Sequence, residues 1–396
     1  MKNYQIYIKL FFLIPVILLF FIIRIFKNFR INKIISHKIG HMTIPIEIYI
    51  CEKKDDPKKI PVIWFFDRRI ANHFLKQQWS QKLLILPRHI LEPIYILFKK
   101  YKFFNIFFED YSKDSEDVKR TLKDGVKHLD DKNVLLKYKP TIQFNYKEKI
   151  QGENYLKKIG CENKKFFVFV SRSNEFHQIS FNQFDEDETV RNSNIHNQIL
   201  GVKFLISKGY KAIRMGKYES NKINSSDTNI IDYATSVDRS DFLDMYLISK
   251  CEFMISGSTG ITTVAALFRK PCLVVDENSL LDSYIFPERL MYLLKKYKNL
   301  KTGKLISFQE AHEKKLVGVQ GISALNKLGY KIIDNNEFEI RKGVESFFDL
   351  INNDLSLDEI LQKQFFFWRT VEKHFGYKNK KSVICPDFYS NNELFE

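Results

Sequence analysis

The sequence has few cysteines, and their spacing forms no recognisable pair. Only five occur in 396 residues, far apart and mostly within apolar runs: Cys51, Cys161, Cys251, Cys272 and Cys385. Because no Cys-x-x-Cys pair is present, the sequence predicts neither a disulfide framework nor a zinc cluster. We expect buried free thiols in a reducing compartment.

Histidine and acidic residues also lack the spacing of a metal site, and no Asp-x-Asp element ends a predicted strand. A metal-dependent mechanism is therefore not predicted. The net charge is +16, but the lysines are scattered rather than gathered in an arginine-rich stripe, and most are expected on a solvated surface. Without a helix-turn-helix, zinc-finger or aromatic RNA-binding pattern, the basic excess favours membranes or phosphate-bearing substrates over nucleic acid.

A long apolar run lies at the amino terminus, where residues 10–23 carry no polar side chain. As a helix this run would be about 21 Å long, which is shorter than the roughly 30 Å core of a bilayer. Flanking lysine and arginine side chains can snorkel and make up the difference. No small-residue cleavage site follows, so a removed secretory signal is not predicted.

Basic residues are more frequent after this run than before it. Lys2 and Lys9 precede its core, and the following segment holds Arg24, Lys27, Arg30, Lys33 and Lys38. Because positive charge stays on the cytoplasmic side, residues 1–35 are predicted to form an anchor with the body of the protein in the cytoplasm. A helix lying on the cytoplasmic leaflet, with the basic cluster against anionic lipid, remains an alternative.

Alternating strand and helix patterns after the anchor indicate an α/β fold in two parts. A first domain is expected over residues 36–150, with strands at 44–51, 60–66 and 82–86 and a helix within 92–108. The charge-rich segment 110–140 is expected to hold loops and a surface helix. Residues 160–345 are expected to form a doubly wound parallel sheet, and residues 346–396 a helical tail that packs back on the body.

The clearest pattern lies in residues 229–276. It comprises a strand at 229–232, a helix at 239–249, a strand at 253–255, the turn Ser256-Gly257-Ser258-Thr259-Gly260, a helix at 262–268 and a strand at 272–275. A turn between a strand and a helix presents backbone N–H groups and a helix dipole to an anion. Hydroxyls on Ser258, Thr259, Thr262 and Thr263 add donors.

This turn therefore predicts a phosphate or diphosphate site, although its spacing matches neither the phosphate loop nor the dinucleotide fingerprint. A tight turn that only lets the helix pack against the sheet is the structural alternative. Further candidates follow other predicted strands or precede the helix expected at 194–208: Arg172, Arg191, Asn192, Arg214, Gly216, Asp232 and Tyr233. Ligands of parallel sheets bind beyond the carboxyl ends of the strands, so one shared site is predicted.

Several of these candidates have structural alternatives. Arg172 could pair with the acids of 185–188, and Arg214 could form a salt bridge at the sheet edge. Asp232 could shape a turn instead of contacting a nucleoside. In the first domain, His41 is the preferred general base because it follows Gly40 and carries an imidazole.

Two carboxylates are the other candidates for this base. Glu47 occupies an alternating position of the strand expected at 44–51, and Asp67 ends the strand expected at 60–66. The alternative to a catalytic role for His41 is that this histidine has a purely structural role.

Several motifs together resemble a family of bacterial glycosyltransferases found with surface-polysaccharide genes. They are Tyr210-Lys-Ala-Ile-Arg-Met-Gly216, Arg191-Asn-Ser-Asn-Ile195, Ile231-Asp-Tyr-Ala234 with Arg239-Ser-Asp241, and Ile39-Gly40-His41 after an apolar amino terminus. The resemblance covers residues 35–345. The turn at 256–260, its helix and Lys270-Pro271 also look like the donor loop of two-domain, GT-B-type transferases, including lipopolysaccharide heptosyltransferases.

The chain departs from that family at two acids. The family's Arg-Asp after the first strand of this domain is Arg172-Ser173 here, and its Arg-Asn-Ser-Asp-Ile is Arg191-Asn-Ser-Asn-Ile. A carboxylate role at positions 173 and 194 is therefore not carried over.

The resemblance implies two Rossmann-like domains in a GT-B-like arrangement, with the acceptor domain first and the donor domain second. It implies a nucleotide-sugar donor bound as substrate, no separate cofactor, no metal, and a glycan or lipid-linked glycan acceptor at the cytoplasmic face of the bacterial inner membrane. Two other functions stay open. One is a non-catalytic membrane-tethered subunit of a polysaccharide assembly complex, and the other is a GT-B-like nucleotide-sugar enzyme such as an epimerase.

Overall fold

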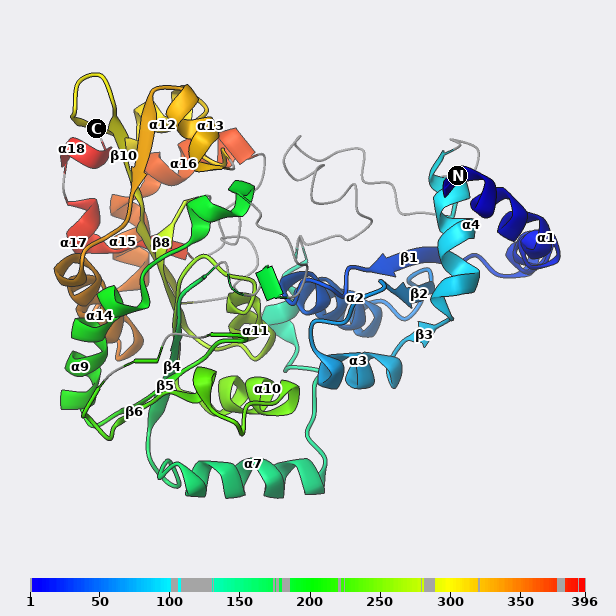
Figure 1. The fold of residues 1–396 in the computed structure, drawn as a ribbon, viewed down its shortest axis with the longest axis horizontal. Coiled ribbons are helices and arrows are strands. Elements are labelled where there is room, and N and C mark those ends of the chain that lie inside the picture. Colours follow the sequence, from blue (N-terminus) through cyan, green and yellow to red (C-terminus); the bar gives the residue numbers. More distant parts are fainter. Residues whose placement is uncertain are drawn as a thin grey trace. The chain divides into compact units, whose positions relative to one another are not determined.

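A computed structural model describes residues 2–100, 106–107, 130, 132–173, 175, 178–179, 186–219, 222–223, 225–278, 280, 289–319, 321–375, 382–390 and 392–395. The chain divides into two compact units, Met1–Ile142 and Gln143–Glu396 (Figure 1). Each unit has its own parallel sheet. Most of the charge-rich segment 110–140 lies outside the described residues, as does position 185, one of the acids considered for Arg172.

The amino-terminal unit is built on a three-stranded parallel sheet in the order β1-β2-β3. The strands are β1 (Arg30–Ile34), β2 (Val62–Phe66) and β3 (Leu84–Ile85). The last two confirm predicted strands. The sequence analysis missed β1 because it assigned residues 24–35 to the basic flank of the anchor, whereas Ile31 and Ile34 are buried.

The helices of this unit are α1 (Lys2–Phe26), α2 (Ile44–Asp55), α3 (His73–Ser80), α4 (Arg88–Lys100) and α6 (Val134–Lys137), with the short 3-10 turn η1 (Gly40–Met42). α2 corrects the prediction of a strand at 44–51. Its residues from Ile44 to Tyr49 are all buried, so the alternation of isoleucines reflects burial on every side rather than a strand period. Pro45 is tolerated because it stands in the first helical turn.

α1 and α4 pack together over this sheet, and their contact forms an apolar core. Its buried members include Phe20, Phe29, Phe65, Leu91 and Phe98. No helix within the described part of the chain combines the length and the apolar character that crossing a membrane requires.

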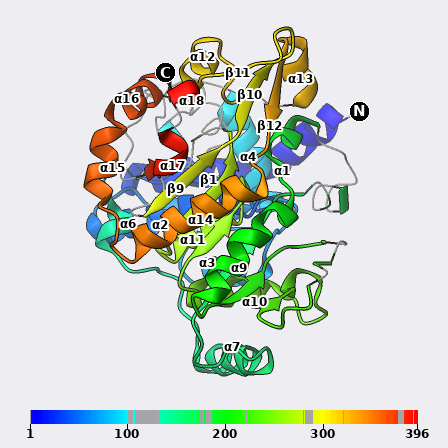
Figure 2. The same ribbon diagram turned by 90° about the vertical axis from the view of Figure 1, so that its left-hand side faces the viewer.

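The carboxyl-terminal unit contains a seven-stranded parallel sheet in the order β13-β9-β8-β7-β4-β5-β6 (Figures 1 and 2). The strands are β4 (Phe166–Val170), β5 (Lys211–Arg214), β6 (Ile230–Ile231), β7 (Met254–Ser256), β8 (Cys272–Glu277), β9 (Leu290–Leu294) and β13 (Ser382–Ile384). The predicted parallel α/β sheet is confirmed.

Helices cover both faces of this sheet. α9 (Ile199–Ser207) and α14 (Glu337–Ile351) pack together on one face, in front of the sheet in Figure 2. On the other face α10 (Asp241–Lys250) contacts α11 (Thr262–Leu267) and α7 (Tyr146–Lys158). Short 3-10 segments, η3 (Glu186–Arg191), η4 (Ile195–Gln198) and η5 (Tyr233–Thr235), lie in the connections.

A small antiparallel sheet, in the order β11-β10-β12, extends this unit. It consists of β10 (Lys296–Asn299), β11 (Leu305–Ile306) and β12 (Tyr330–Ile333), together with α12 (Phe308–Glu313) and α13 (Ile322–Lys327). The Ser307 side chain caps α12 by accepting a hydrogen bond from the backbone N–H of Glu310.

The carboxyl-terminal tail supplies a strand to the large sheet as well as several helices. Its helices are α15 (Leu357–Lys363), α16 (Phe365–Phe375), α17 (Pro386–Tyr389) and α18 (Asn392–Phe395). β13 pairs in parallel with β9, so the tail completes the edge of the large sheet.

The order of strands reverses beside β4. The chain first adds β5 and β6 on one side of β4 and then places β7 on the other side. In open parallel sheets such a reversal separates the loops that follow the two neighbouring strands, and ligands bind between them. The segments after β4 and β7 therefore mark the expected site.

Candidate functional site

Three segments meet at the carboxyl edge of β4 and β7. A Cβ atom added to Gly257 would lie 2.7 Å from Ser193 Oγ and 3.4 Å from the backbone nitrogen of Arg172. A side chain here would push the Ser193 hydroxyl aside, so the glycine allows the three segments to pack closely. The structure thus brings together the segments that hold the predicted residues Arg172, Asn192 and Gly257.

A guanidinium group lies against the turn of residues 256–260, called the glycine turn below. Arg191, the last residue of η3, donates from Nε to Ser258 Oγ at 3.3 Å. Ser258 in turn donates to Glu277 Oε1 at 3.2 Å. An arginine fork suits a phosphate, so this contact supplies the turn with a positive charge.

Glu277 is a site residue that the sequence analysis missed. It ends β8, is almost fully buried, and also accepts a hydrogen bond from its neighbour's backbone N–H. The predicted strand stopped two residues earlier, at position 275. A carboxylate directly beyond a buried strand at this edge was the signal that could have identified it.

Lys295 is a second residue that sequence reasoning missed. It follows β9, is buried, and its ammonium group bonds the backbone carbonyl of Asn192 and the Asp334 carboxylate, the latter at 2.7 Å. Paired in this way, the buried charge fixes the loop that carries Arg191 and Asn192.

Asp276 lies next to Glu277 in a β-bulge of β8 and has a positive φ of 54°. Its Oδ1 accepts hydrogen bonds from the backbone N–H of Asn335 at 2.7 Å and from Asn335 Nδ2 at 2.8 Å. Burial raises the pKa of this carboxyl to about 6. The two adjacent acids of β8 therefore have different partners, since Glu277 bonds the glycine turn and Asp276 bonds Asn335.

The glycine turn is held from within. Thr262 is buried, and its hydroxyl lies 2.6 Å from Ser256 Oγ, so this side chain stabilises the turn. Thr259 and Gly260 are half-buried and reach the surface. α11 has only six residues, so few peptide dipoles add up along it and the charge at this turn comes mainly from Arg191.

At the end of β5, Arg214 adopts the structural alternative considered for it. Its buried guanidinium pairs with Asp232 and Glu219, each at 3.2 Å. Glu219 also accepts a hydrogen bond from Ser173 at 3.0 Å. A Cβ on Gly216 would lie 2.6 Å from the Glu219 side chain, so this glycine lets the loop fold back. The charges of Arg214 and Asp232 thus compensate each other at the sheet edge.

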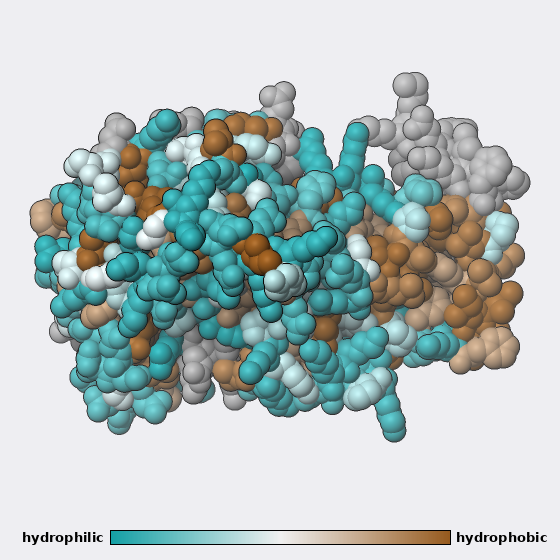
Figure 3. All heavy atoms as spheres, turned by 90° about the horizontal axis from the view of Figure 1, so that it is seen from below, coloured by the Kyte–Doolittle hydropathy of each residue, from teal (hydrophilic) through white to brown (hydrophobic). Residues whose placement is uncertain are grey.

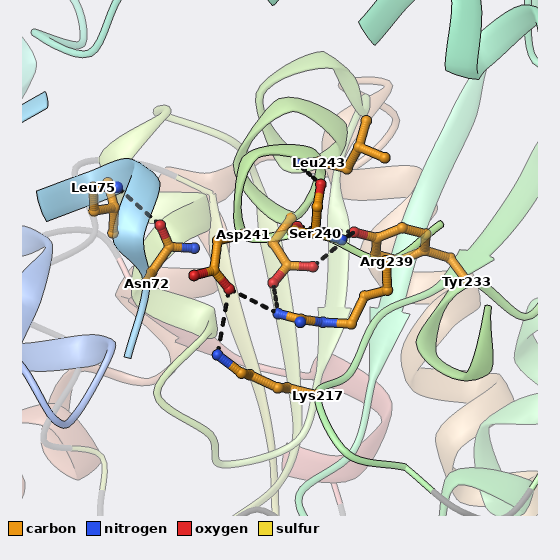
Figure 4. A network of polar contacts seen from close by, with 9 residues as sticks. Asn72, Leu75, Lys217, Tyr233, Arg239, Ser240, Asp241 and Leu243 are labelled. Carbon is orange, nitrogen blue, oxygen red and sulfur yellow. Dashed lines mark hydrogen bonds and ion pairs between the residues drawn. The ribbon is translucent and has the colours of Figure 1, made fainter. Parts of the chain in front are cut away.

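Tyr233 is enclosed in the protein rather than exposed toward a nucleoside. Its ring is fully buried, and its hydroxyl donates to Asp244 Oδ1 at 2.9 Å while accepting from the Ser240 backbone N–H. Arg239 pairs with Asp244 and with Asp241 (Figure 4). Burial raises the pKa of Asp244 to about 6, although Arg239 opposes this. This network gives Tyr233 a structural role.

In the amino-terminal unit, a histidine and an aspartate meet beyond the ends of β1 and β2. His37 Nδ1 lies 2.7 Å from Asp67 Oδ2, and both side chains are partly exposed. The hydrogen bond from His37 lowers the pKa of Asp67 to about 2, with help from the Arg68 backbone N–H and Lys33. A carboxylate on one ring nitrogen orients an imidazole for proton transfer at the other.

The two preferred base candidates of the sequence analysis lie elsewhere in this unit. His41 is half-buried in η1. Glu47 is in α2, not in a strand, and is fully buried. Its Oε1 accepts the Thr141 backbone N–H at 3.0 Å and its Oε2 accepts the Thr141 hydroxyl. This carboxylate connects α2 to the end of the unit, which is a structural role.

All five cysteines are buried and free, as predicted. The described residues contain no cluster of three or more histidine, cysteine, aspartate or glutamate side chains placed to hold a metal ion.

No protein-family model matches the chain, and no curated protein matches it either. Among solved structures it is similar to Escherichia coli ADP-heptose lipopolysaccharide heptosyltransferase II, with 12% identity and a TM-score of 0.37 over 62% of this chain and 84% of that chain. It is similar to a family 9 glycosyl transferase from Veillonella parvula, with 11% identity and a TM-score of 0.44 over 81% and 97%.

A third similar structure is Staphylococcus aureus MnaA with UDP, at 13% identity and a TM-score of 0.36 over 89% of this chain and 92% of that chain. Such low values assign no function.

Proposed function

We propose that the chain is a glycosyltransferase that binds a nucleotide-sugar at the reversal point of its seven-stranded sheet. The observation that carries the proposal is the meeting of Arg191, the glycine turn and the backbone of Arg172 at that point. The nucleotide-sugar is the substrate, and no separate cofactor or metal is invoked.

Sugar transfer from such a donor releases a nucleotide phosphate whose negative charge grows in the transition state. Fixed donors aimed at this charge lower the barrier, and they act more strongly where water is excluded. Arg191 is held by Ser258, and its loop is fixed by Lys295, so the guanidinium needs little reorganisation. Thr259 and Gly260 are accessible from solvent at the same turn.

The acceptor hydroxyl has to lose a proton, and we propose that His37 takes it. Asp67 holds Nδ1 of the ring and stabilises the imidazolium that forms, so Nε2 is the nitrogen that would accept the proton. His41, the base favoured by the sequence, is the competing proposal. The acceptor is proposed to be a glycan or a lipid-linked glycan at the cytoplasmic face of the bacterial inner membrane.

The first test measures nucleotide binding to the full chain. Thermal unfolding is followed with UDP, GDP, CMP, dTDP and ADP, and a selective, saturable rise in Tm is expected for one of them. Arg191→Ala should abolish the rise. Arg341→Ala removes an exposed arginine that pairs with Glu345 on α14, so it is the matched control and should retain the rise.

A flat response from folded protein across the whole panel would contradict the proposal and favour the non-catalytic tethered subunit. A nucleotide-dependent rise with conversion of the nucleotide-sugar in the absence of any acceptor would favour the epimerase alternative. Acceptor-dependent release of the nucleotide is the result that the proposal requires.

A further inference from the structure

The first helix has two different sides, although its residues 10–23 are apolar throughout. On one side Leu13, Val16, Ile17, Phe20 and Phe21 pack against the core of the amino-terminal unit. The ring of Phe21 meets that of Phe107 edge-on at 5.3 Å, and Phe20 meets Phe29 at 5.6 Å. This side of α1 is part of the unit's interior.

The helix end is fixed as well. Arg24 donates from Nη1 to the Phe29 carbonyl at 2.9 Å, and its guanidinium lies 4.8 Å from the centre of the Phe107 ring. Lifting α1 out to cross a bilayer on its own would therefore break these contacts and expose the aromatic core. The packing favours a helix that keeps its inner side on the protein.

The opposite side of α1 carries a stripe of large apolar side chains that are 39–85% exposed. The members of this stripe, called the outer stripe below, are Ile14, Leu18, Leu19, Ile22, Ile23, Ile25 and Phe26. Steps of three and four residues place them on one helix face. Figure 3 shows apolar surface gathered over the part of the amino-terminal unit where α1 lies. Soluble surfaces rarely expose a contiguous patch of this kind.

A positive charge follows this stripe at the carboxyl end of α1, where Lys27 is exposed directly after the helix. Every member of the outer stripe is apolar, so the stripe offers no polar group that could recognise a protein partner. Apolar surface next to an exposed lysine matches the boundary between acyl chains and anionic headgroups.

We propose that α1 binds in the plane of an anionic lipid bilayer, with the outer stripe immersed and its inner side still packed on the amino-terminal unit. Lys27 meets the headgroups. The inference does not depend on the sugar transfer proposed above, since it concerns only where the amino-terminal unit is held.

The test uses flotation of the full chain with vesicles of phosphatidylcholine containing phosphatidylglycerol. Wild-type protein is expected to float with them, more weakly with phosphatidylcholine alone, and less at high salt. The double variant Leu18→Glu/Ile22→Glu should lose at least about tenfold in binding, because charge on the immersed face opposes insertion. Leu300→Glu changes an equally exposed leucine of the other unit and should bind as wild type.

Phe26→Ser, at the exposed helix end, is a milder variant should the double variant fail to fold, and it should also weaken binding. Extraction at high pH and salt then separates the two membrane geometries. A helix lying in the interface is released, and protein that resists extraction would overturn the proposal in favour of a spanning anchor.

Two further results would also overturn it. One is undiminished flotation of the Leu18→Glu/Ile22→Glu variant. The other is a dimer in solution that this variant dissociates, with no flotation of the wild type, because the outer stripe would then be an interface between two copies. Nucleotide binding measured on the same variants should be unchanged, so failure here is distinguishable from failure of the donor site.

Discussion

Arg191 Nε lies 3.3 Å from Ser258 Oγ, although 67 residues separate the two in the chain. The contact joins the loop before η4 to the glycine turn and so connects the two sides of the reversal point. Four predictions follow from this edge and from the His37–Asp67 pair.

Gly257→Ala should damage the donor site. The new methyl group would lie 2.7 Å from Ser193 Oγ, so the Ser193 side chain must move, and 3.4 Å from the Arg172 backbone nitrogen. We expect a loss of about 1–3 kcal/mol in the free energy of unfolding, together with weaker nucleotide binding. Urea unfolding and titration with the selected nucleotide measure the two effects.

Gly343→Ala in α14 is the control, since its methyl group would come no closer than 3.5 Å to Leu293. It should leave nucleotide binding intact and change stability by less than about 1 kcal/mol. Equal effects of both substitutions would show that the close contact at Gly257 is unimportant.

Asp276→Asn should change the pH dependence of stability. The carboxyl has a folded-state pKa of about 6, raised by burial above an ordinary value near 3.9. The folded state therefore holds the proton more tightly, and wild-type stability from this group is present at low pH and declines as pH rises from about 4 to 6. The free energy of unfolding of the variant, relative to that of the wild type, should therefore be about 2–3 kcal/mol higher at pH 7 than at pH 4.

The quantity to compare is the difference in free energy of unfolding between variant and wild type, measured by urea at several pH values. The pH dependence of this difference is the informative quantity. A change in stability that asparagine causes equally at every pH does not affect it. A difference that stays constant between pH 4 and 7 would refute the raised pKa of Asp276.

His37→Ala should abolish sugar transfer while leaving nucleotide binding unchanged. General-base catalysis contributes about 10²–10⁴-fold, and that loss is expected in kcat. Asp67→Asn should lower kcat as well, since the ring loses the carboxylate that orients it. His73→Ala, an exposed histidine of α3, is the matched control and should retain activity.

Glu47→Gln tests the second base considered from the sequence, where His41 is the preferred one. It should lower stability by roughly 1–3 kcal/mol because Glu47 accepts two buried hydrogen bonds from Thr141, yet activity per folded molecule should persist. Full activity of His37→Ala with inactive Glu47→Gln would reverse the assignment.

Ser173→Asp restores the acid of the family pattern and should destabilise this chain. Ser173 donates to Glu219 at 3.0 Å, and burial already raises the pKa of Glu219, so a second carboxylate there would meet a poorly solvated charge. We expect a loss of about 1–3 kcal/mol at pH 8 and a smaller loss at pH 4, because the raised pKa of Glu219 leaves less negative charge on its carboxyl at the lower pH.

The double variant Ser173→Asp/Glu219→Gln tests the cause. If charge repulsion is responsible, removing the carboxylate of Glu219 should recover most of the lost stability in thermal unfolding. No recovery would mean that the serine is required for its size and not for its neutrality.

Much of the carboxyl-terminal unit could be predicted from the sequence, because its signals are local. β4, β7, α10 and the glycine turn each follow from apolar runs, helical spacing or glycine within a few residues. Alternation of these elements was sufficient to indicate a parallel sheet. The position of Arg172 and Gly257 at one edge followed from the same alternation.

The amino-terminal unit was predicted less well, because burial removes the period that distinguishes helix from strand. The first part of α2, from Ile44 to Tyr49, is enclosed on all sides, so its isoleucines alternate without forming a strand. β1 and β13 are short segments that become strands only through their partners β2 and β9. Nothing within these few residues marks them.

The sequence by itself determined the α/β class, the glycine turn and the apolar first helix, since each depends on neighbours along the chain. Only the tertiary structure decided which polar groups meet. The parallel register of β1 and β2 brings His37 to Asp67, the strand reversal brings Arg191 to Ser258, and packing divides α1 into a buried and an exposed side. Pairings across tens of residues depend on the fold, because interactions between sequence neighbours do not bring such distant residues together.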